Sequence, residues 1–341
     1  MKRGKRCLRV LLISALLILA FALPVSASSK PDKPKYFRVE SQGDLSATLR
    51  WSRASGISGF TLYQYNFATK KYKAVKQLPA SSYTCTIKNL KKNTKYRYIL
   101  KAYKTKNGKK IYSSASDKAD FTAKELSDSV LSIRRPRYTV TTKKNVTVLN
   151  KTTKKKVTLK KGTKLTVTAK EGNTVNGFLK NGDQISIKRS YLKYTGLDAS
   201  AKKDYSKSLK EEFVNVKGYT SNTDWMIWVS EMTFKVNVYK GSRGKWKLVK
   251  SFPCCVGRWN ARTSSGVRSI LSKGTKWEYG GPWIYFTSGA GDKYNPEGCA
   301  FHAQPDKNMS KAISHGCVRM QMSGLMYIYN NCPVGTRVVI Y

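Results

Sequence analysis

The chain has 341 residues and a formal net charge of +46 at pH 7, from 65 Lys and Arg against 19 Asp and Glu. This length exceeds one ordinary domain, so we expect two or three domains. So large a positive charge indicates that the protein surface attracts polyanions. The alternative is that the lysines only keep the surface solvated. Nucleic acid is not the expected polyanion, because the lysines are spread along strand-like segments without interleaved base-stacking aromatics.

The first 27 residues have the pattern of a secretory signal peptide. Residues 1–9 carry five basic residues and no acid, residues 10–23 are almost wholly apolar, and small residues precede Ala27. We expect cleavage after Ala27. An uncleaved anchor is the alternative, but fourteen apolar residues are fewer than the about 20 that a spanning helix needs. The mature chain is therefore expected to be secreted, with no stable transmembrane anchor.

The positive charge of the expected mature chain is concentrated in its front part. Residues 28–221 hold 44 Lys and Arg against 13 Asp and Glu, while residues 222–341 hold 16 against 6. The excess is therefore +31 in front and +10 behind. For an exported chain, the anionic polymers of a bacterial envelope are the expected partners. We expect a cell-wall-associated protein, of a Gram-positive type of envelope.

In residues 33–123, apolar and polar side chains alternate as they do in the strands of a β-sandwich. The alternating runs are separated by short turns that contain Gly, Asn and Ser. Leu49-Arg50-Trp51 resembles the core-tryptophan strand of a fibronectin type III module, and Leu90 to Tyr96 resembles the turn that leads to its tyrosine corner. The resemblance implies the fold, and by itself it implies no activity. The runs in question are 47–51, 59–63, 83–87 and 96–103.

Residues 138–195 alternate again, now with many Thr and Lys. Five short strands of this kind predict a small β-barrel, and the segment resembles a bacterial SH3-like wall-binding module. A helical linker is expected over residues 196–219, with a charged helix from about residue 201 to 215.

Residues 220–341 predict a third, mostly β domain. It opens with a hairpin of strands at 226–230 and 234–239, and it closes with a strand at 337–341. A helix is expected over residues 323–330. The fold class expected for the whole chain is therefore mainly β and multidomain.

Six of the seven cysteines lie beyond the signal peptide. An even number in an exported chain is compatible with disulfides. The spacing argues against a framework of them, because Cys85 stands alone in its region and Cys254 and Cys255 are adjacent. We expect few or no disulfides, and a pairing of Cys299 with Cys332 or Cys255 stays open.

The two histidines of the chain lie close to one cysteine. His302 precedes the tetrapeptide Ser314-His315-Gly316-Cys317, which contains the other histidine. A cysteine acts as a nucleophile near neutral pH when a neighbour stabilises its thiolate, and imidazole is the side chain suited to do so. A cysteine enzyme is therefore the leading hypothesis.

Three other interpretations of these residues compete with a cysteine enzyme. Cys299, His302, His315 and Cys317 are the residue types of a zinc site, but their intervals fit no common zinc module. A papain-like wall peptidase has its histidine after its cysteine, whereas no histidine follows Cys317. A non-catalytic wall-binding protein stays open, although every expected reacting residue is present.

The order of motifs in the last domain resembles the L,D-transpeptidase (YkuD-like) catalytic domain family, over about 120 residues. The shared features begin with Val256-Gly257 and Thr263-x-x-Gly266. They continue with Phe301-His302 and with the run from Ser314 to Met320. Ser264 stands where the family has proline, and Ala303 stands where it has Gly or Ser. These departures concern the fit of the substrate more than the reacting groups.

The resemblance implies a role for each matched residue. Cys317 would be the nucleophile, and His302, oriented by a backbone carbonyl, would accept and return the proton. The amides of Cys317 and Gly316 would hold the oxyanion. Ser314 and His315 would shape the site, and Arg319 would stabilise it or meet a substrate carboxylate. No metal and no organic cofactor is required.

The implied activity is that of an exported peptidoglycan L,D-transpeptidase in cell wall biogenesis, which bears on cell shape. Such an enzyme forms a thioester with a stem tetrapeptide, releases the terminal D-amino acid and transfers the acyl group to a neighbouring stem amine. The alternatives are an L,D-carboxypeptidase or wall peptidase that uses the same cysteine, and a wall-binding protein without activity.

Overall fold

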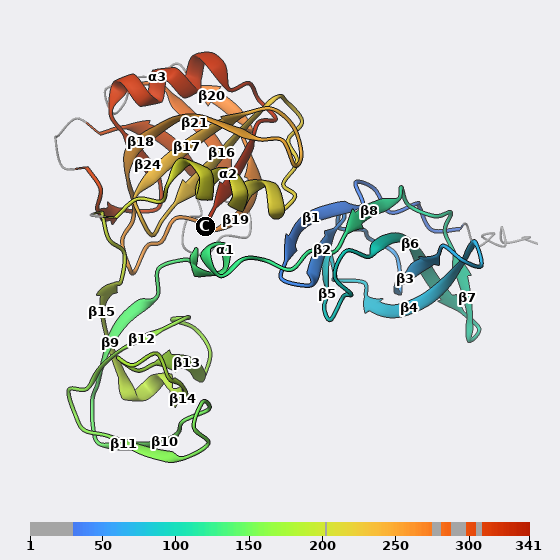
Figure 1. Cartoon of the computed structure of the whole chain (residues 1–341). Coiled ribbons are helices and arrows are strands. Elements are labelled where there is room, and N and C mark those ends of the chain that lie inside the picture. Colours follow the sequence, from blue (N-terminus) through green and yellow to red (C-terminus); the bar gives the residue numbers. More distant parts are fainter. Residues whose placement is uncertain (1–29, 202, 275–280, 288–297, 305–308) are drawn as a thin grey trace, which may run out of the picture.

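The computed structural model describes residues 30–201, 203–274, 281–287, 298–304 and 309–341. The expected signal peptide, residues 1–27, lies outside them. The described residues form three β-rich units that are joined by short connectors (Figure 1). The mainly β, multidomain fold expected from the alternating sequence is confirmed. Within these ranges, no helix has the length and apolar character needed to cross a membrane.

The first unit is a sandwich of two antiparallel sheets. One sheet has the order β1-β2-β5; the other has the order β4-β3-β6-β7, with β8 on the first half of β6. Trp51 is buried between the sheets, and its ring centroid lies 5.5 Å from that of Phe60. The hydroxyl of Tyr96 accepts a hydrogen bond from the Lys91 amide at 3.0 Å, which closes the expected tyrosine corner. The strands are β1 Arg38–Gly43, β2 Ser46–Arg50, β3 Gly59–Asn66, β4 Lys71–Pro79, β5 Thr84–Ile87, β6 Lys95–Lys106, β7 Lys109–Tyr112 and β8 Ala119–Thr122.

The second unit is a five-stranded antiparallel sheet with an added hairpin. The sheet order is β14-β13-β12-β9-β15, and β10 pairs with β11. Both parts share one core, in which Val140, Leu165 and Ile185 are buried. The sequence predicted five short strands here, whereas the described residues form seven, arranged as one sheet and one hairpin around a single core. Its elements are β9 Tyr138–Thr142, β10 Val146–Leu149, β11 Lys156–Leu159, β12 Lys164–Val167, β13 Thr174–Phe178, β14 Gln184–Lys188, η1 Arg189–Tyr191 and β15 Leu192–Leu197.

The third unit is built on one long, curved sheet of order β19-β25-β16-β17-β18-β24-β22-β21-β20, to which β23 is added beside β18. Most neighbours are antiparallel, but β16 pairs with β25, β22 pairs with β24 and β18 pairs with β23 in parallel. The strands are β16 Trp225–Ser230, β17 Lys235–Lys240, β18 Lys247–Gly257, β19 Gly266–Ser269, β20 Ser272–Gly274, β21 Trp283–Thr287, β22 Cys299–Ala303, β23 Ala312–Ser314, β24 Val318–Met320 and β25 Arg337–Ile340.

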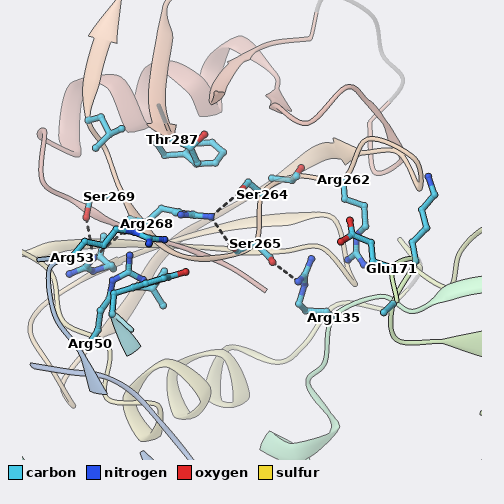
Figure 2. A pocket seen from close by; sticks show the side chains of 18 of the residues that line it. Arg50, Arg53, Arg135, Glu171, Arg262, Ser264, Ser265, Arg268, Ser269 and Thr287 are labelled. Atoms are coloured by element: carbon cyan, nitrogen blue, oxygen red, sulfur yellow. Dashed lines mark hydrogen bonds between the residues drawn. The ribbon is translucent and has the colours of Figure 1, made fainter. Parts of the chain in front are cut away.

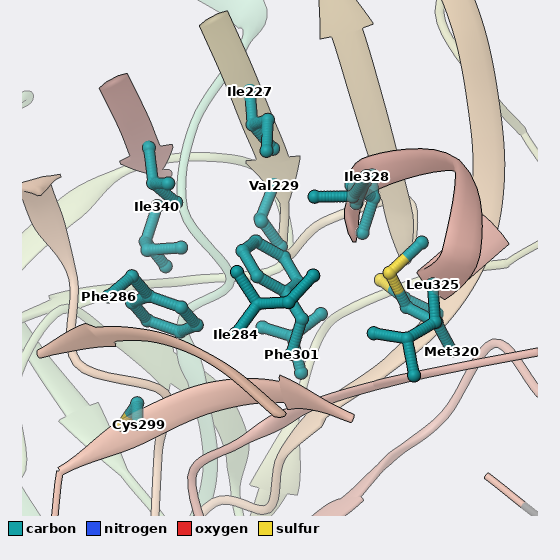
Figure 3. Close-up of a cluster of buried hydrophobic side chains, with 14 of the residues drawn as sticks. Ile227, Val229, Ile284, Phe286, Cys299, Phe301, Met320, Leu325, Ile328 and Ile340 are labelled. Carbon is teal, nitrogen blue, oxygen red and sulfur yellow. The ribbon is translucent and has the colours of Figure 1, made fainter. Parts of the chain in front are cut away.

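The central strands of this sheet, β16, β17 and β25, are buried on both faces. Helix α3 (Met322–Asn331) covers the inner face, where Leu325 and Ile328 pack on Phe301 and Ile284 (Figure 3). Helices α1 (Asp128–Ser132) and α2 (Lys207–Val216) pack on the outer face, together with Trp228. Burial on two faces explains the continuous apolar run of β16, because a strand with one wet face would alternate instead.

Helix positions differ from the expectation in two places. The charged helix begins at Lys207, because the Ser206 hydroxyl caps it by accepting from the Leu209 amide, and not near residue 201. Helix α1 was not expected, because its five residues carry too few apolar positions for a periodic signal. Ser127 caps it in the same way as Ser206 caps α2.

The cysteines of the core are thiols. Cys85, Cys254 and Cys332 are buried and form no disulfide, so the Cys299–Cys332 pairing considered from the sequence is not present. Burial raises the pKa of the Cys332 thiol to about 12, which leaves it protonated and unreactive at neutral pH.

Candidate active site

The parallel pairing of β22 with β24 brings the histidine and the cysteine motifs together. Phe301 lies opposite Val318, and His302 lies opposite Arg319. Phe301 and Val318 point into the core. Because side chains alternate across a strand, His302 and Arg319 point to the other face. Cys317 directly precedes β24, so this pairing brings its turn next to the strand that carries His302.

The turn that carries Cys317 is held by the buried Ser314. Strands β23 and β24 both pair with β18, so residues 315–317 form a tight connection at the end of that strand. The Ser314 hydroxyl donates to the Cys317 carbonyl at 2.6 Å and accepts from the Gly316 amide at 3.1 Å. Gly316 has a φ of +135°, which favours glycine over residues with a side chain. Ser314 and Gly316 therefore define the backbone around the thiol.

His302 is held in one orientation and one tautomer. The imidazole is 5% exposed, and its Nδ1 lies 2.9 Å from the Ala303 carbonyl oxygen. A carbonyl oxygen can only accept, so the proton of the neutral ring is on Nδ1. The lone pair is then on Nε2, which is the atom that accepts a proton. The Ala303 carbonyl is the orienting group that the family resemblance implied.

The surroundings of His302 favour the neutral imidazole. The ring stacks on Trp283 with centroids 4.6 Å apart and planes at 23°. Burial lowers the pKa of His302 to about 4, the hydrogen bond to Ala303 partly opposes that change, and the positive charge of Arg319 adds to it. At neutral pH the ring is therefore uncharged and able to take a proton.

Arg319 lies beside His302 and is half-buried. Its Nη1 donates to the Gln304 side-chain oxygen at 3.4 Å, a long hydrogen bond to a neutral group. The backbone of Gln304 is fixed, because its N–H donates to the Met320 backbone carbonyl at 2.7 Å. The guanidinium therefore adds positive charge next to the site.

The loop after β18, residues 258–263, supports the turn that carries Cys317. The Gly257 amide donates to the buried Thr263 hydroxyl at 2.9 Å, and the Arg258 amide donates to the Ser314 carbonyl at 2.9 Å. A Cβ on Gly257 would lie 2.2 Å from the Ala261 carbonyl oxygen, so the loop closes only on glycine. The Val-Gly and Thr-x-x-Gly motifs thus act together, because they fix the end of β18 beside Ser314.

The residues that resembled a zinc set do not gather around one point. Cys299 is buried at the start of β22, whereas His315 is exposed on the reactive turn. Among the residues that the structure describes, no group of three or more His, Cys, Asp or Glu is placed to hold a metal ion.

Family models match two parts of this chain. Residues 224–340 match the L,D-transpeptidase catalytic domain model named YkuD, and residues 32–117 match the fibronectin type III domain. Residues 224–340 are therefore similar to the L,D-transpeptidase catalytic domain family. That family comprises cysteine-dependent L,D-transpeptidases and peptidases of peptidoglycan. The matches confirm both resemblances that the motifs indicated.

Solved structures resemble parts of the chain. A fused Zn-dependent amidase/peptidase/peptidoglycan-binding domain-containing protein from Clostridium acetobutylicum is 25% identical, with 40% of this chain and 59% of that chain covered and a TM-score of 0.33. The Bdellovibrio bacteriovorus protein Bd1075 is 16% identical, with 36% and 50% covered and a TM-score of 0.30. An Fn3-like protein from Clostridium thermocellum is 20% identical, with 28% and 97% covered and a TM-score of 0.22. The chain spans half to three-fifths of the first two proteins. No curated protein matches it.

Two parts of the candidate site were missed in the sequence. Trp283, which covers His302, lies nineteen residues upstream, in β21. Gln304, two residues after the histidine, holds Arg319. The position of Gln304 beside the His302 motif was the one signal for it, whereas nothing in the local pattern linked Trp283 to the imidazole.

Proposed function

We propose that the protein is an exported peptidoglycan L,D-transpeptidase with Cys317 as nucleophile and His302 as base. The observation that carries the proposal is the neutral imidazole of His302, whose Nδ1 proton points at the Ala303 carbonyl, on the strand that pairs with β24 directly after Cys317. A neutral ring with its lone pair on Nε2 accepts a thiol proton at physiological pH. The family match of residues 224–340 supports the substrate class.

In the first half-reaction, Nε2 of His302 takes the proton of the Cys317 thiol. The sulfur attacks the carbonyl carbon of the amide that follows the third residue of a stem tetrapeptide. The C–N bond then breaks, His302 returns the proton to the leaving nitrogen, and the terminal D-amino acid departs. A thioester between Cys317 and the stem remains.

In the second half-reaction, an amine of a neighbouring stem attacks the thioester carbonyl. His302 takes a proton from that amine, the C–S bond breaks, and the sulfur leaves and regains the proton. The new amide links two stems. Water in place of the amine would make the same machinery a carboxypeptidase, which is the alternative outcome of the test below.

Around these two groups we assign supporting roles. Ser314 and Gly316 shape the turn, His315 is exposed at its rim, and Arg319 meets a substrate carboxylate or stabilises the site. The Cys317 amide is the proposed oxyanion donor. The Gly316 amide already donates to Ser314 Oγ at 3.1 Å, so its part in the oxyanion hole would require that hydrogen bond to be shared. One oxyanion donor is typically worth about 2.7 to 4 kcal/mol at the transition state.

The remaining modules are proposed to keep the enzyme at the wall. In this proposal residues 1–27 direct export. Residues 33–123 and 138–195, as fibronectin type III-like and SH3-like modules, attract anionic wall polymers by their positive charge, and residues 220–341 do the chemistry. Tethering raises the effective concentration of the enzyme at its substrate.

The proposal is tested by mass spectrometry of products from a disaccharide tetrapeptide. We expect the mature protein to remove the terminal residue and to form dimers, and Cys317→Ala to do neither. Loss of the terminal residue without dimers would indicate a carboxypeptidase. An identical product pattern from the Cys317→Ala protein would refute the enzyme reading.

The two histidines are separated by a matched pair of variants. His302→Gln keeps a polar side chain but removes the base, so we expect kcat to fall by roughly 10² to 10⁴. His315→Gln changes an exposed side chain, and we expect less than about a tenfold loss, since it takes no part in the proton transfer. A larger loss from His315→Gln than from His302→Gln would reverse the assignment.

A further inference from the structure

A cleft away from Cys317 is formed by all three units of the chain. Its volume is about 1210 Å³, and its described lining includes neither Cys317 nor His302. Arg50 and Arg53 come from the sandwich, Arg135 from the connector, and Arg268 from the catalytic domain (Figure 2). Its described lining includes Thr263, whose hydroxyl supports the loop behind Ser314.

The cations of this cleft are arginines, although the protein is rich in lysine. The chain has 48 Lys and 17 Arg. Of the eight cationic side chains in the described lining, seven are arginines and one is Lys170. Generic surface charge would bring mostly lysines. The planar guanidinium instead presents paired donors that match phosphate and carboxylate oxygens.

Part of this charge has no compensating carboxylate in the described structure. Arg53 and Arg268 appear in none of the ion pairs between described residues. Arg268 donates to the Ser264 hydroxyl at 2.8 Å and the Ser265 carbonyl at 3.2 Å, both neutral. The Arg53 guanidinium stacks 4.3 Å from the Tyr83 ring centroid. Both side chains therefore keep their full charge towards the cleft.

The carboxylates that are present leave an excess of positive charge. Glu40 lies 3.1 Å from Arg38, and Glu231 lies 3.0 Å from Arg135. With Glu171 in the lining, three carboxylates face eight cations among the described residues, an excess of five. Concentrating like charges in a partly enclosed space is unfavourable unless an anion occupies it.

Arg337, at the inner wall of the cleft, reflects this crowding. It is 7% exposed, and its guanidinium donates to the Thr220 carbonyl at 2.7 Å and to the Ser269 hydroxyl at 3.2 Å. Burial lowers the pKa of Arg337, and the charges of Arg38 and Arg50 lower it further, against the opposing effect of Glu40. An anion in the cleft would relieve this repulsion.

We propose that the cleft binds a phosphodiester polymer, a chain of phosphate groups joined by uncharged polyol or sugar units. The volume and the five excess charges exceed what one phosphate ion needs, so several groups of one chain are expected to bind together. Arginine forks and the hydroxyls of Ser264, Ser265 and Ser269 supply the donors. The inference rests on the proposed function only for the envelope as the source of the polymer.

Two of the aromatic rings that line the cleft favour this polymer over nucleic acid. The rings of Tyr83 and Trp259 each have a cation over one face, Arg53 at 4.3 Å and Lys170 at 4.9 Å from the centroid. Sequence-independent binding of single strands uses aromatic faces that are open to stacked bases. Rings already covered by cations are suited to a chain that has no bases.

Binding is measured with the full mature chain carrying Cys317→Ala, so that no turnover intervenes. The probe is a fluorescent glycerol-phosphate oligomer of about ten units, followed by anisotropy at low salt. We expect Arg53→Gln/Arg268→Gln to weaken binding at least tenfold. This double variant removes two guanidinium groups that form no ion pair with a described carboxylate. Arg53→Lys/Arg268→Lys, which keeps the charge, should fall in between.

The matched control is Lys73→Gln/Arg189→Gln, which removes two exposed charges outside the cleft. We expect less than a twofold effect. A loss as large as that of the cleft variant would overturn the proposal in favour of diffuse attraction. Circular dichroism checks that every variant is folded.

Other probes decide the ligand class. If polyglutamate of equal charge binds as tightly, the proposal that the ligand carries phosphate groups is overturned. If low-millimolar inorganic phosphate competes completely, the proposal that the ligand is a polymer is overturned. An oligodeoxythymidylate of equal charge that binds more tightly would favour nucleic acid instead. Because this readout needs no catalysis, its failure leaves the proposed transpeptidation intact, and the reverse also holds.

Discussion

The imidazole of His302 is chemically defined by two contacts. The Ala303 carbonyl selects the tautomer with the proton on Nδ1, and the ring of Trp283, 4.6 Å away between centroids, shields it from water. The first contact is local and follows from the neighbouring residue. The second joins β21 to β22 and depends on how the sheet is assembled. Without that cover, the pKa of the imidazole would lie closer to the value of a free histidine.

We predict an acid limb of kcat/KM well below pH 6.5. Burial lowers the pKa of His302 to about 4, so the neutral base persists in mildly acidic solution. Trp283→Leu removes the aromatic cover, and the limb should move up by about one to two pH units, towards the value of an exposed imidazole. Trp283→Phe keeps a ring and should leave the limb nearly unchanged. Rates between pH 3.5 and 8 measure this, and a limb at pH 6.5 in the parent protein would contradict it.

The same titration affects stability, with a definite sign. The folded pKa of about 4 lies below the unfolded value, so the unfolded chain binds more protons between pH 6.5 and 4. The free energy of unfolding therefore falls as the pH drops through this window, by an amount on the order of 3 kcal/mol for this group. In His302→Gln that part of the pH dependence should be missing.

At the scale of elements, the loop after β18 connects two motifs that look separate in the sequence. Gly257 and Thr263 meet through one hydrogen bond of 2.9 Å, and Arg258 then reaches the Ser314 carbonyl. The residue types of the Thr-x-x-Gly motif were visible in the sequence, but their purpose was not. Whether a threonine hydroxyl caps a strand end six residues earlier depends on the path of the loop.

We predict that Thr263→Val destabilises the catalytic domain by about 1 to 3 kcal/mol. The valine is similar in shape but leaves the buried Gly257 amide without its acceptor. Thr263→Ser keeps the hydroxyl and should cost less. The measurement is the midpoint of the unfolding transition that accompanies loss of activity. Equal midpoints for the valine and serine variants would show that the hydrogen bond contributes nothing.

Alternation predicted most strands of the chain, because half-buried strands repeat every second residue. Strands β20, β23 and β24 were not anticipated, since three residues are too few for a pattern. Two of these carry the candidate site, as β23 and β24 flank the reactive turn. Short strands form because neighbouring strands offer hydrogen bonds, and this depends on tertiary structure.

At the scale of the whole molecule, the connector between the first two units is fastened to the catalytic domain. Glu231 is completely buried and accepts from Arg135 of the connector at 3.0 Å and from Arg262 at 3.2 Å. Helix α1 adds Val130 to the outer core of the sheet. The connector, residues 124–137, is thus part of a packed interface. This interface in turn forms one wall of the arginine cleft.

We predict that Glu231→Ala destabilises the protein by about 3 to 5 kcal/mol, because it leaves cations at a buried position without their counter-ion. The matched control is Asp117→Ala, which breaks an exposed pair with Lys33 and should cost less than about 1 kcal/mol. Limited proteolysis of residues 124–137 should be faster in Glu231→Ala, since the connector loses its anchor. Indistinguishable unfolding and cleavage in the two variants would contradict this.

Residue types and their order in the chain predicted a mainly β protein, an L,D-transpeptidase catalytic domain and the two reacting groups proposed for it. Those features are local, because alternation and short motifs involve residues within a few positions of one another. Tertiary structure decided the environment. It brought Trp283 onto His302, joined Thr263 to the loop behind Ser314, and gathered Arg53, Arg135 and Arg268 into one cleft. Protonation states and ligand sites depend on burial and on charges from distant segments, and these are determined only when the chain has folded.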